Sequence, residues 1–275
     1  MHFLHIDWNP SKGIDLSFFT LHYYSMMWIV AFILGFYIMK RIYKNENESN
    51  ESLDSLFIYS VVGIMLGARL GHVIFYQPEL FKEDFWSVFL PFSFKGGIHF
   101  TGFQGLASHG AAMAMIVSMY LYNKKVLKKS VLWILDRVVI PVASGAVFVR
   151  FGNFINSEII GKPTNSDYGV VFTKLGEDFP RHPAQLYEAI CYVFVFFILF
   201  YFYRKTKKSE QEGFLFGLFL VLLWTVRFFV EFVKEPQGDE FINFFNLKTG
   251  QWLSIPFILI GLYFMFVYKP KSKLS

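Results

Sequence analysis

VLWILDRVVIPVASGAVFVRFGNFINSEIIG, residues 131–161, decides how the chain must fold. It opens with an apolar run close to the ~20 residues that cross a lipid bilayer as a helix. Directly after that run, RFGNFINSEIIG at 150–161 brings an arginine, two asparagines and a glutamate. Such hydrogen-bonding side chains at the outlet of a membrane helix need a physical reason to be there. The stretch therefore combines a candidate membrane span with a candidate polar site.

The composition is that of an integral membrane protein. Hydrophobic residues make up 54% of the 275 residues and charged residues only 17%, against about 45–50% and about 25% in soluble domains. The formal net charge of +5 is explained by basic clusters that suit an anionic membrane surface, so no nucleic-acid partner is needed.

Seven apolar segments approach the length of a membrane span, at about 20–39, 56–76, 105–122, 131–149, 186–203, 214–233 and 252–268. The fourth is the weakest because Asp136, Arg137 and Pro141 interrupt it, although a helix buried among others tolerates such breaks. Six helices is the alternative count, and Asp136 and Arg137 are interpreted as structural. We expect an all-α, polytopic membrane fold of about seven transmembrane helices with a periplasmic-side cap.

Basic residues indicate the orientation. Fourteen of the 26 lie in four short segments: Lys40, Arg41 and Lys44; Lys124, Lys125, Lys128 and Lys129; Arg204, Lys205, Lys207 and Lys208; Lys269, Lys271 and Lys273. The positive-inside rule places them in the cytoplasm, with the N-terminus outside and the C-terminus cytoplasmic. The long outer connections at 77–104 and 150–185 then favour interfacial or re-entrant structure. Residues 1–275 are expected to form a single membrane-embedded domain.

Charged residues inside the apolar segments are the strongest functional signal, because each costs ~3 kcal/mol at a helix centre. They are Arg69, His109, Arg150, Glu188, Arg227 and Glu231. With the predicted orientation all of them map to the outer half of the membrane, and Tyr24 in the first helix joins them. A common depth predicts one outer-leaflet cavity.

Each residue also has a simpler reading. Arg227 and Glu231 are four apart and could neutralise each other on one helix face. His109 alone would more often be a hydrogen-bonded core histidine, and Arg69 could extend toward the interface. These separate readings do not explain the common depth.

The planar guanidinium group of arginine offers two parallel N–H donors that match the oxygens of a phosphate. At this depth the nearest phosphate belongs to a lipid. An anionic phospholipid is therefore the expected ligand. Gly63, Gly67 and Gly71, at four-residue spacing, favour close helix packing and could also hold Arg69 in place.

Five motifs in this order resemble one enzyme family: GARLGHVIFY at 67–76, GLASHGA at 105–111, RFGNFINSEIIG at 150–161, HPAQLYE at 182–188 and RFFVEFVKEP at 227–236. The chain resembles the bacterial phosphatidylglycerol–prolipoprotein diacylglyceryl transferases over about residues 20–268. The asparagine-rich stretch is the most specific of these motifs. The chain departs from the family pattern at Val149 and Ala111, where glycines are usual.

The resemblance implies a seven-helix enzyme of the bacterial inner membrane that serves lipoprotein biosynthesis. It implies transfer of diacylglyceryl from phosphatidylglycerol to the lipobox cysteine of a prolipoprotein signal peptide, with release of glycerol phosphate. Carried over by motif, the site residues are Tyr24, Arg69, His109, Arg150, Asn153, Asn156, Glu158, Gly161, Arg227 and Glu231.

The chemistry assigns catalytic roles to three of these residues. His109 is the expected general base for the substrate thiol, because its ordinary pKa of ~6.5 lies nearest working pH. Arg150 and Arg227 are expected to hold the phosphate as it gains charge, with Glu231 orienting Arg227. The others are expected to bind substrate, and no metal or cofactor is required. A competing assignment makes an arginine-polarised phosphate oxygen the proton acceptor.

The alternative function is a membrane transporter with an outer-facing charged cavity. A transporter predicts polar residues spread through the membrane depth, and often two related halves. The sequence has its charges clustered outward and no visible repeat, which favours the enzyme.

Overall fold

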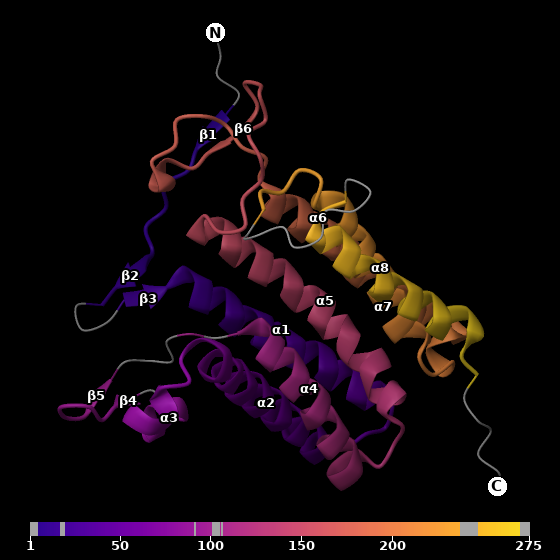
Figure 1. The fold of residues 1–275 in the computed structure, drawn as a ribbon. Helices are drawn as coiled ribbons and strands as arrows, with labels where there is room; N and C mark the ends of the chain where they lie inside the picture. Colours follow the sequence, from indigo (N-terminus) through magenta and orange to yellow (C-terminus); the bar gives the residue numbers. More distant parts are fainter. Residues whose placement is uncertain are drawn as a thin grey trace, which may run out of the picture. The chain divides into compact units, whose positions relative to one another are not determined.

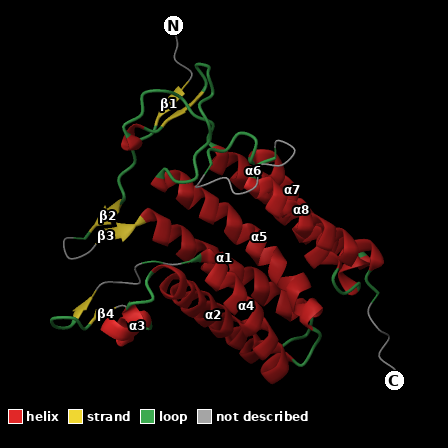
Figure 2. Ribbon diagram, viewed as in Figure 1, coloured by secondary structure: helices red, strands yellow, loops and turns green. Residues whose placement is uncertain are grey.

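The structure is a computed structural model that describes residues 5–16, 20–90, 92–100, 105, 107–236 and 247–269; the side chains of Ser108 and His109 lie outside this description. Helices dominate the described chain, and strands are few and short (Figures 1 and 2). The predicted all-α class is confirmed.

Each predicted span corresponds to a helix. They are α1 (Tyr23–Asn45), α2 (Asn50–Tyr76), α4 (Ser108–Tyr122), α5 (Val131–Asn156), α6 (Ala184–Lys205), α7 (Phe214–Val230) and α8 (Thr249–Leu262). Among the described residues, five helices are long and apolar enough to cross a membrane: α1, α2, α5, α6, and α8 with its π-helical continuation to Val267. Helices α7 and α4 are shorter, at 17 and 15 residues. A multi-pass membrane protein is therefore shown, and the count of seven spans stays a prediction.

Short elements connect these helices. They are α3 (Leu80–Glu83), the 3-10 turns at Phe85–Val88, Thr173–Leu175 and Lys207–Glu210, the π turn at Asn123–Leu127, and the strands β1 (His5–Asp7), β2 (Gly13–Asp15), β3 (Thr20–His22), β4 (Phe92–Ser93), β5 (His99–Phe100) and β6 (Gly169–Val171). Strands β2 with β3 and β4 with β5 pair antiparallel, whereas β1 and β6 pair parallel.

The weakest predicted span, α5, is a continuous helix of 26 residues with Pro141 inside it. Its fully buried Asp136 accepts hydrogen bonds from the backbone N–H groups of Gly213 (2.7 Å) and Phe216 (2.8 Å). These groups belong to the start of α7, where backbone donors have no partner within the helix and a carboxylate is stabilising. Asp136 thus has the structural role predicted for it.

The chain forms two compact units: residues up to Met39 together with those from Leu135 onward, and residues Lys40–Ile134. In the first unit, α6, α7 and α8 run side by side (Figure 1). Trp224 of α7 stacks on Phe257 of α8 at 4.2 Å between ring centroids.

In the second unit, α2 and α4 pack through small residues (Figure 1). A Cβ atom added to Gly67 would lie 2.2 Å from Ala114 Cβ and 2.5 Å from the Gly110 carbonyl oxygen. One added to Gly71 would lie 2.7 Å from Gly110 Cα. The prediction that these glycines allow close helix packing is confirmed.

We expect Gly67→Ala to lower the thermal unfolding midpoint in detergent, because overpacking costs about 1–3 kcal/mol. Gly35→Ala is the matched control: its added Cβ would meet Pro141 at 3.6 Å, an ordinary contact, and alanine is the better helix former. A Gly67→Ala variant as stable as Gly35→Ala would contradict the packing argument.

Candidate functional site

The polar end of α5 owes its shape to two left-handed residues. The helix ends at Asn156, and Ser157 (φ 59°) and Ile159 (φ 58°) then turn the backbone sharply. The turn is closed by hydrogen bonds from Ser157 N–H to the Phe154 carbonyl (3.0 Å) and from Glu158 N–H to the Asn153 carbonyl (2.9 Å). A positive φ is rare for a β-branched residue and is typical of functional segments.

This turn brings four predicted site residues into one hydrogen-bonded chain. Arg150 Nη1 donates to Asn153 Oδ1 (3.3 Å), and Asn153 Nδ2 donates to Glu158 Oε2 (3.3 Å). Asn156 Nδ2 donates to the second Glu158 oxygen at 3.1 Å. Gln185 of α6 anchors the turn by donating from Nε2 to the Glu158 backbone carbonyl (2.5 Å).

A buried cluster of charges lies next to this chain. Glu188 of α6 has a side chain only 1% exposed, and its Oε2 lies 2.6 Å from Arg150 Nε. Lys234, which follows α7, places its Nζ 3.9 Å from Glu188 Oε1 and 3.6 Å from Glu231 Oε2. Buried charges are stable only when they are paired in this way.

Arg227 reaches the same cluster from α7. Its guanidinium carbon lies 5.2 Å from the centre of the Trp224 ring, and its buried Nε has no hydrogen-bond partner among the described residues. Both Arg150 and Arg227 lie within electrostatic range of Tyr192 and Lys234. The two arginines therefore share their surroundings instead of pointing into unrelated regions.

Glu231 forms its ion pair with Lys234, whereas the simpler reading of the sequence paired it with Arg227. Its ion pair in the described chain is with Lys234, and none forms there with Arg227. Its carboxyl group also packs against Gly250, where an added Cβ would lie 2.6 Å from the carboxyl carbon. The described chain therefore contains no direct ion pair through which Glu231 would neutralise Arg227 or orient it.

Two more predicted residues lie beside the cluster. The ring of Tyr24 in α1 lies over Gly152 of α5, where an added Cβ would be 2.9 Å from Tyr24 Cδ2. Gly161 donates from its N–H to the His182 carbonyl (3.0 Å). An added Cβ there would lie 2.3 Å from that same oxygen, so only glycine fits.

A cap covers the end of α5. Strand β1 pairs with β6, and Trp8 stacks on Phe154 at 4.4 Å while its Nε1 donates to the Phe154 carbonyl (3.0 Å). Phe154 packs there with Val170 and Phe172. The cap therefore packs against the last turn of α5.

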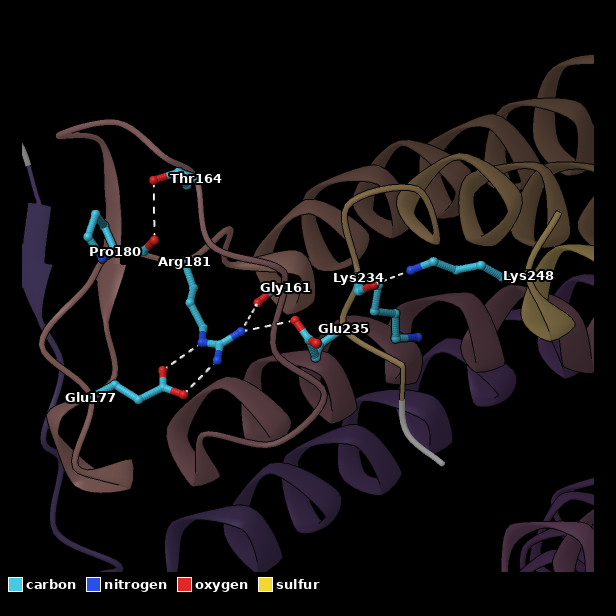
Figure 3. Close-up of polar contacts among 8 residues, drawn as sticks. All are labelled: Gly161, Thr164, Glu177, Pro180, Arg181, Lys234, Glu235 and Lys248. Carbon is cyan, nitrogen blue, oxygen red and sulfur yellow. Dashed lines mark hydrogen bonds and ion pairs between the residues drawn. The ribbon is translucent and has the colours of Figure 1, made fainter. Parts of the chain in front are cut away.

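Arg181 clamps the cap to the segment after α7 (Figure 3). Its Nε and Nη2 donate to the two Glu177 oxygens at 2.6 and 2.7 Å, and its Nη1 donates to the Gly161 carbonyl and to Glu235 Oε2, both at 3.1 Å. The hydrogen bonds to Glu177 raise the pKa of Arg181. The clamp fixes Gly161 next to Lys234, with which it forms an antiparallel bridge.

The second unit holds the other two predicted residues. Arg69 is 7% exposed and donates from Nη2 to the Ser87 carbonyl (2.9 Å), so the reading as a side chain extended to the interface does not hold. Asp84 organises the same segment by accepting from Phe94 N–H (2.9 Å) and Ser93 Oγ (2.8 Å), and these bonds, the Phe94 bond foremost, lower its pKa. His109 lies in the first turn of α4, and its side chain lies outside the described residues.

Sequence reasoning missed Lys234, Gln185 and Arg181 as parts of this arrangement, and it noted Glu188 without a role. The signal was present for three of them, since Gln185 and Glu188 lie inside HPAQLYE and Lys234 lies inside RFFVEFVKEP. Lys234 lies three residues after Glu231, a spacing that allows pairing on a continued helical turn.

We expect Arg181→Met to loosen the cap, because Arg181 makes contacts to three separate points of the backbone and side chains. Amide hydrogen exchange at residues 161–164 and 181–182 should accelerate at least tenfold. Lys174→Met, in the same cap but outside the clamp, should exchange as the unmodified protein does. Equal protection in both variants would contradict the clamp.

Fold and site together define a multi-pass membrane protein with a buried cluster of arginine, lysine and glutamate beside a capped helix end. The family model described as "Prolipoprotein diacylglyceryl transferase" matches residues 12–267. The chain belongs to this family.

Relatives bear the same description. A phosphatidylglycerol–prolipoprotein diacylglyceryl transferase of Bacteroides fragilis is 41% identical over 99% of this chain and 98% of its own length. The proteins of that name from Tolumonas auensis and Chloroherpeton thalassium are 40% identical over 94% and 95%, and 34% identical over 98% and 97%, of the two chains respectively. The transporter alternative finds no support in these comparisons.

Proposed function

We propose that this protein transfers the diacylglyceryl group of phosphatidylglycerol to the thiol of a prolipoprotein's lipobox cysteine. A carbon–sulfur thioether bond forms, the carbon–oxygen bond to the phosphate breaks, and glycerol phosphate leaves. The family membership and the names of the relatives support this activity. Residues 1–275 act in this proposal as one membrane-embedded transferase domain.

The observation that carries the proposal is the pairing of charges in the buried cluster. Among the described residues, Arg150 and Lys234 form ion pairs with the carboxylates of Glu188 and Glu231, and Arg227 forms none. Arg227 therefore keeps a positive charge without an ion pair in the described chain, which suits the negative charge of a phosphodiester. In a buried setting such a charge interacts more strongly than in water.

The two arginines hold the phosphate in this mechanism. Arg150 is oriented by Glu188 and Asn153, and Arg227 keeps a buried N–H group that no described residue accepts. As the carbon–oxygen bond breaks, negative charge grows on the phosphate oxygens and both contacts strengthen. Preorganised donors of this kind stabilise a transition state most effectively.

The remaining residues take supporting roles in the proposal. Asn153, Asn156 and Glu158 present neutral and acidic groups to the glycerol headgroup or the lipobox backbone, beside Tyr24 and Gly161. His109 serves as general base for the thiol, and Arg69 contributes to substrate binding through the segment that it holds. Glu231 acts through Lys234.

We further propose a bacterial inner-membrane location with the N-terminus periplasmic and the C-terminus cytoplasmic. The four basic clusters support this orientation, and the bacterial relatives support the location.

The direct experiment is incubation of purified protein with phosphatidylglycerol labelled in its acyl chains and a peptide that carries a lipobox cysteine. We expect label on the peptide and equimolar release of glycerol phosphate. A peptide with serine in place of the cysteine is the control and should remain unlabelled. Absence of transfer to the cysteine peptide would overturn the proposal.

Arg150→Lys and Arg227→Lys should each lower turnover by about 100-fold, because a point charge cannot replace the fork that grips two phosphate oxygens. Arg204→Lys, in the last turn of α6, is the matched control and should retain full turnover. Unchanged turnover in either site variant would contradict the phosphate clamp.

His109→Gln separates the two candidate proton acceptors. If His109 is the base, turnover should fall by about 100-fold or more, and raising the pH should recover part of it because more of the thiol is then ionised. Turnover near that of the unmodified protein would assign the proton to a phosphate oxygen.

A further inference from the structure

Lys234 is buried more deeply than its position in the chain suggests. It lies just after the last turn of α7, yet it is only 4% exposed. Its ammonium group stands between two buried carboxylates that come from different elements, Glu188 of α6 and Glu231 at the end of α7. A lysine is seldom so buried unless it has such partners.

The backbone of Lys234 is fixed from two sides. Lys248 Nζ donates to the Lys234 carbonyl at 2.5 Å (Figure 3). Its neighbours form a short antiparallel pairing with the turn after α5, in which Lys162 N–H donates to the Val233 carbonyl (2.8 Å) and Glu235 N–H donates to the Ile160 carbonyl (3.1 Å). Arg181 then ties Glu235 to the cap at 3.1 Å. These contacts fix the backbone from which the side chain of Lys234 extends into the cluster.

The surroundings of Lys234 lower its pKa on balance, and burial is the largest cause. Burial lowers its pKa, Glu188 and Glu231 act to raise it, and Arg150 and Arg227 act to lower it further. The other four charged groups of the cluster thus all affect this one ammonium group. Removing its charge would leave two buried carboxylates with the two arginines as their remaining cationic neighbours in the cluster.

We propose that Lys234 is a positioning residue that occupies Glu231 and the Oε1 atom of Glu188, so that Arg227 stays unpaired and Arg150 keeps its single contact to Glu188 through Nε. Without the lysine, Glu231 would attract the guanidinium group of Arg227, and both oxygens of Glu188 would be available to Arg150. The substrate's phosphate would then have to compete with these carboxylates for the two arginines. This inference rests on the proposed function and adds a residue to it. Loss of the lysine would weaken binding of the phospholipid, whereas binding of the acceptor peptide would be unchanged.

Kinetics of Lys234→Met test this role, because methionine keeps the length of the side chain and removes its charge. The KM for phosphatidylglycerol should rise about tenfold, with the KM for the lipobox peptide unchanged. Lys234→Arg keeps the charge and should restore the phospholipid KM to within about threefold of the unmodified value. Lys174→Met, the same change at a lysine of the cap outside the cluster, should leave both constants unchanged.

A double variant shows whether the lysine acts through the carboxylates. Glu231→Gln in the Lys234→Met background removes one uncompensated charge, so the double variant should bind phosphatidylglycerol more tightly than Lys234→Met alone. If Lys234→Met does not fold, the double variant can be measured in its place, because it has one fewer buried charge without a partner. In that case its phospholipid KM should lie closer to that of the unmodified protein than to a tenfold increase.

Three outcomes would overturn the role of Lys234. They are an unchanged phospholipid KM in Lys234→Met, equal increases in both KM values, and effects of the two substitutions that simply add. Each presupposes that the unmodified protein transfers label to the cysteine peptide in the same assay. If it does not, the proposed function itself fails, and this result is distinguishable from the other three.

Discussion

The ion pair between Arg150 and Glu188 is the contact on which the rest of the site depends. It joins the outlet of α5 to the second turn of α6 at 2.6 Å, in surroundings from which water is largely excluded. Loss of one partner from such a pair typically costs 3–5 kcal/mol, because the other charge is left buried and unpaired. Arg150 donates a hydrogen bond to Asn153, and Asn153 donates one to Glu158. Gln185 of α6 then binds the backbone carbonyl of Glu158, which links the turn back to α6. One interaction thus holds together residues from two helices and the turn between them.

Burying Glu188, Glu231 and Lys234 is expensive, and the fold offsets the cost by pairing these groups with one another and with Arg150. Arg227 forms no ion pair among the described residues. In the proposed mechanism, the substrate's phosphate supplies the missing negative partner. Because the charge on the phosphate grows as it leaves, this contact would favour the transition state more than the bound substrate.

Much of this arrangement could be predicted from sequence, and the parts that could not have a common cause. Helix positions follow from the length of apolar runs, and Asp136 could be predicted as structural because it interrupts such a run. The links that give Lys234 and Arg181 their places in the site were missed because they join distant parts of the chain: Lys234 meets Glu188 of α6, and Arg181 meets Glu235 across 54 residues. The left-handed Ser157 and Ile159 were also unpredictable, since neither is a glycine or an asparagine. Motif resemblance supplied the identities of the site residues where spacing alone could not.

The pairing of β1 with β6 has a consequence for how the protein is made. Trp8 and Phe154 are 146 residues apart in sequence, so the extreme N-terminal strand must wait for its partner until α5 and the segment beyond it have been synthesised. Closing so long a loop carries an entropic cost. The cap can therefore assemble on the last turn of α5 only after β6 has been made, which places this contact late in the folding of the chain.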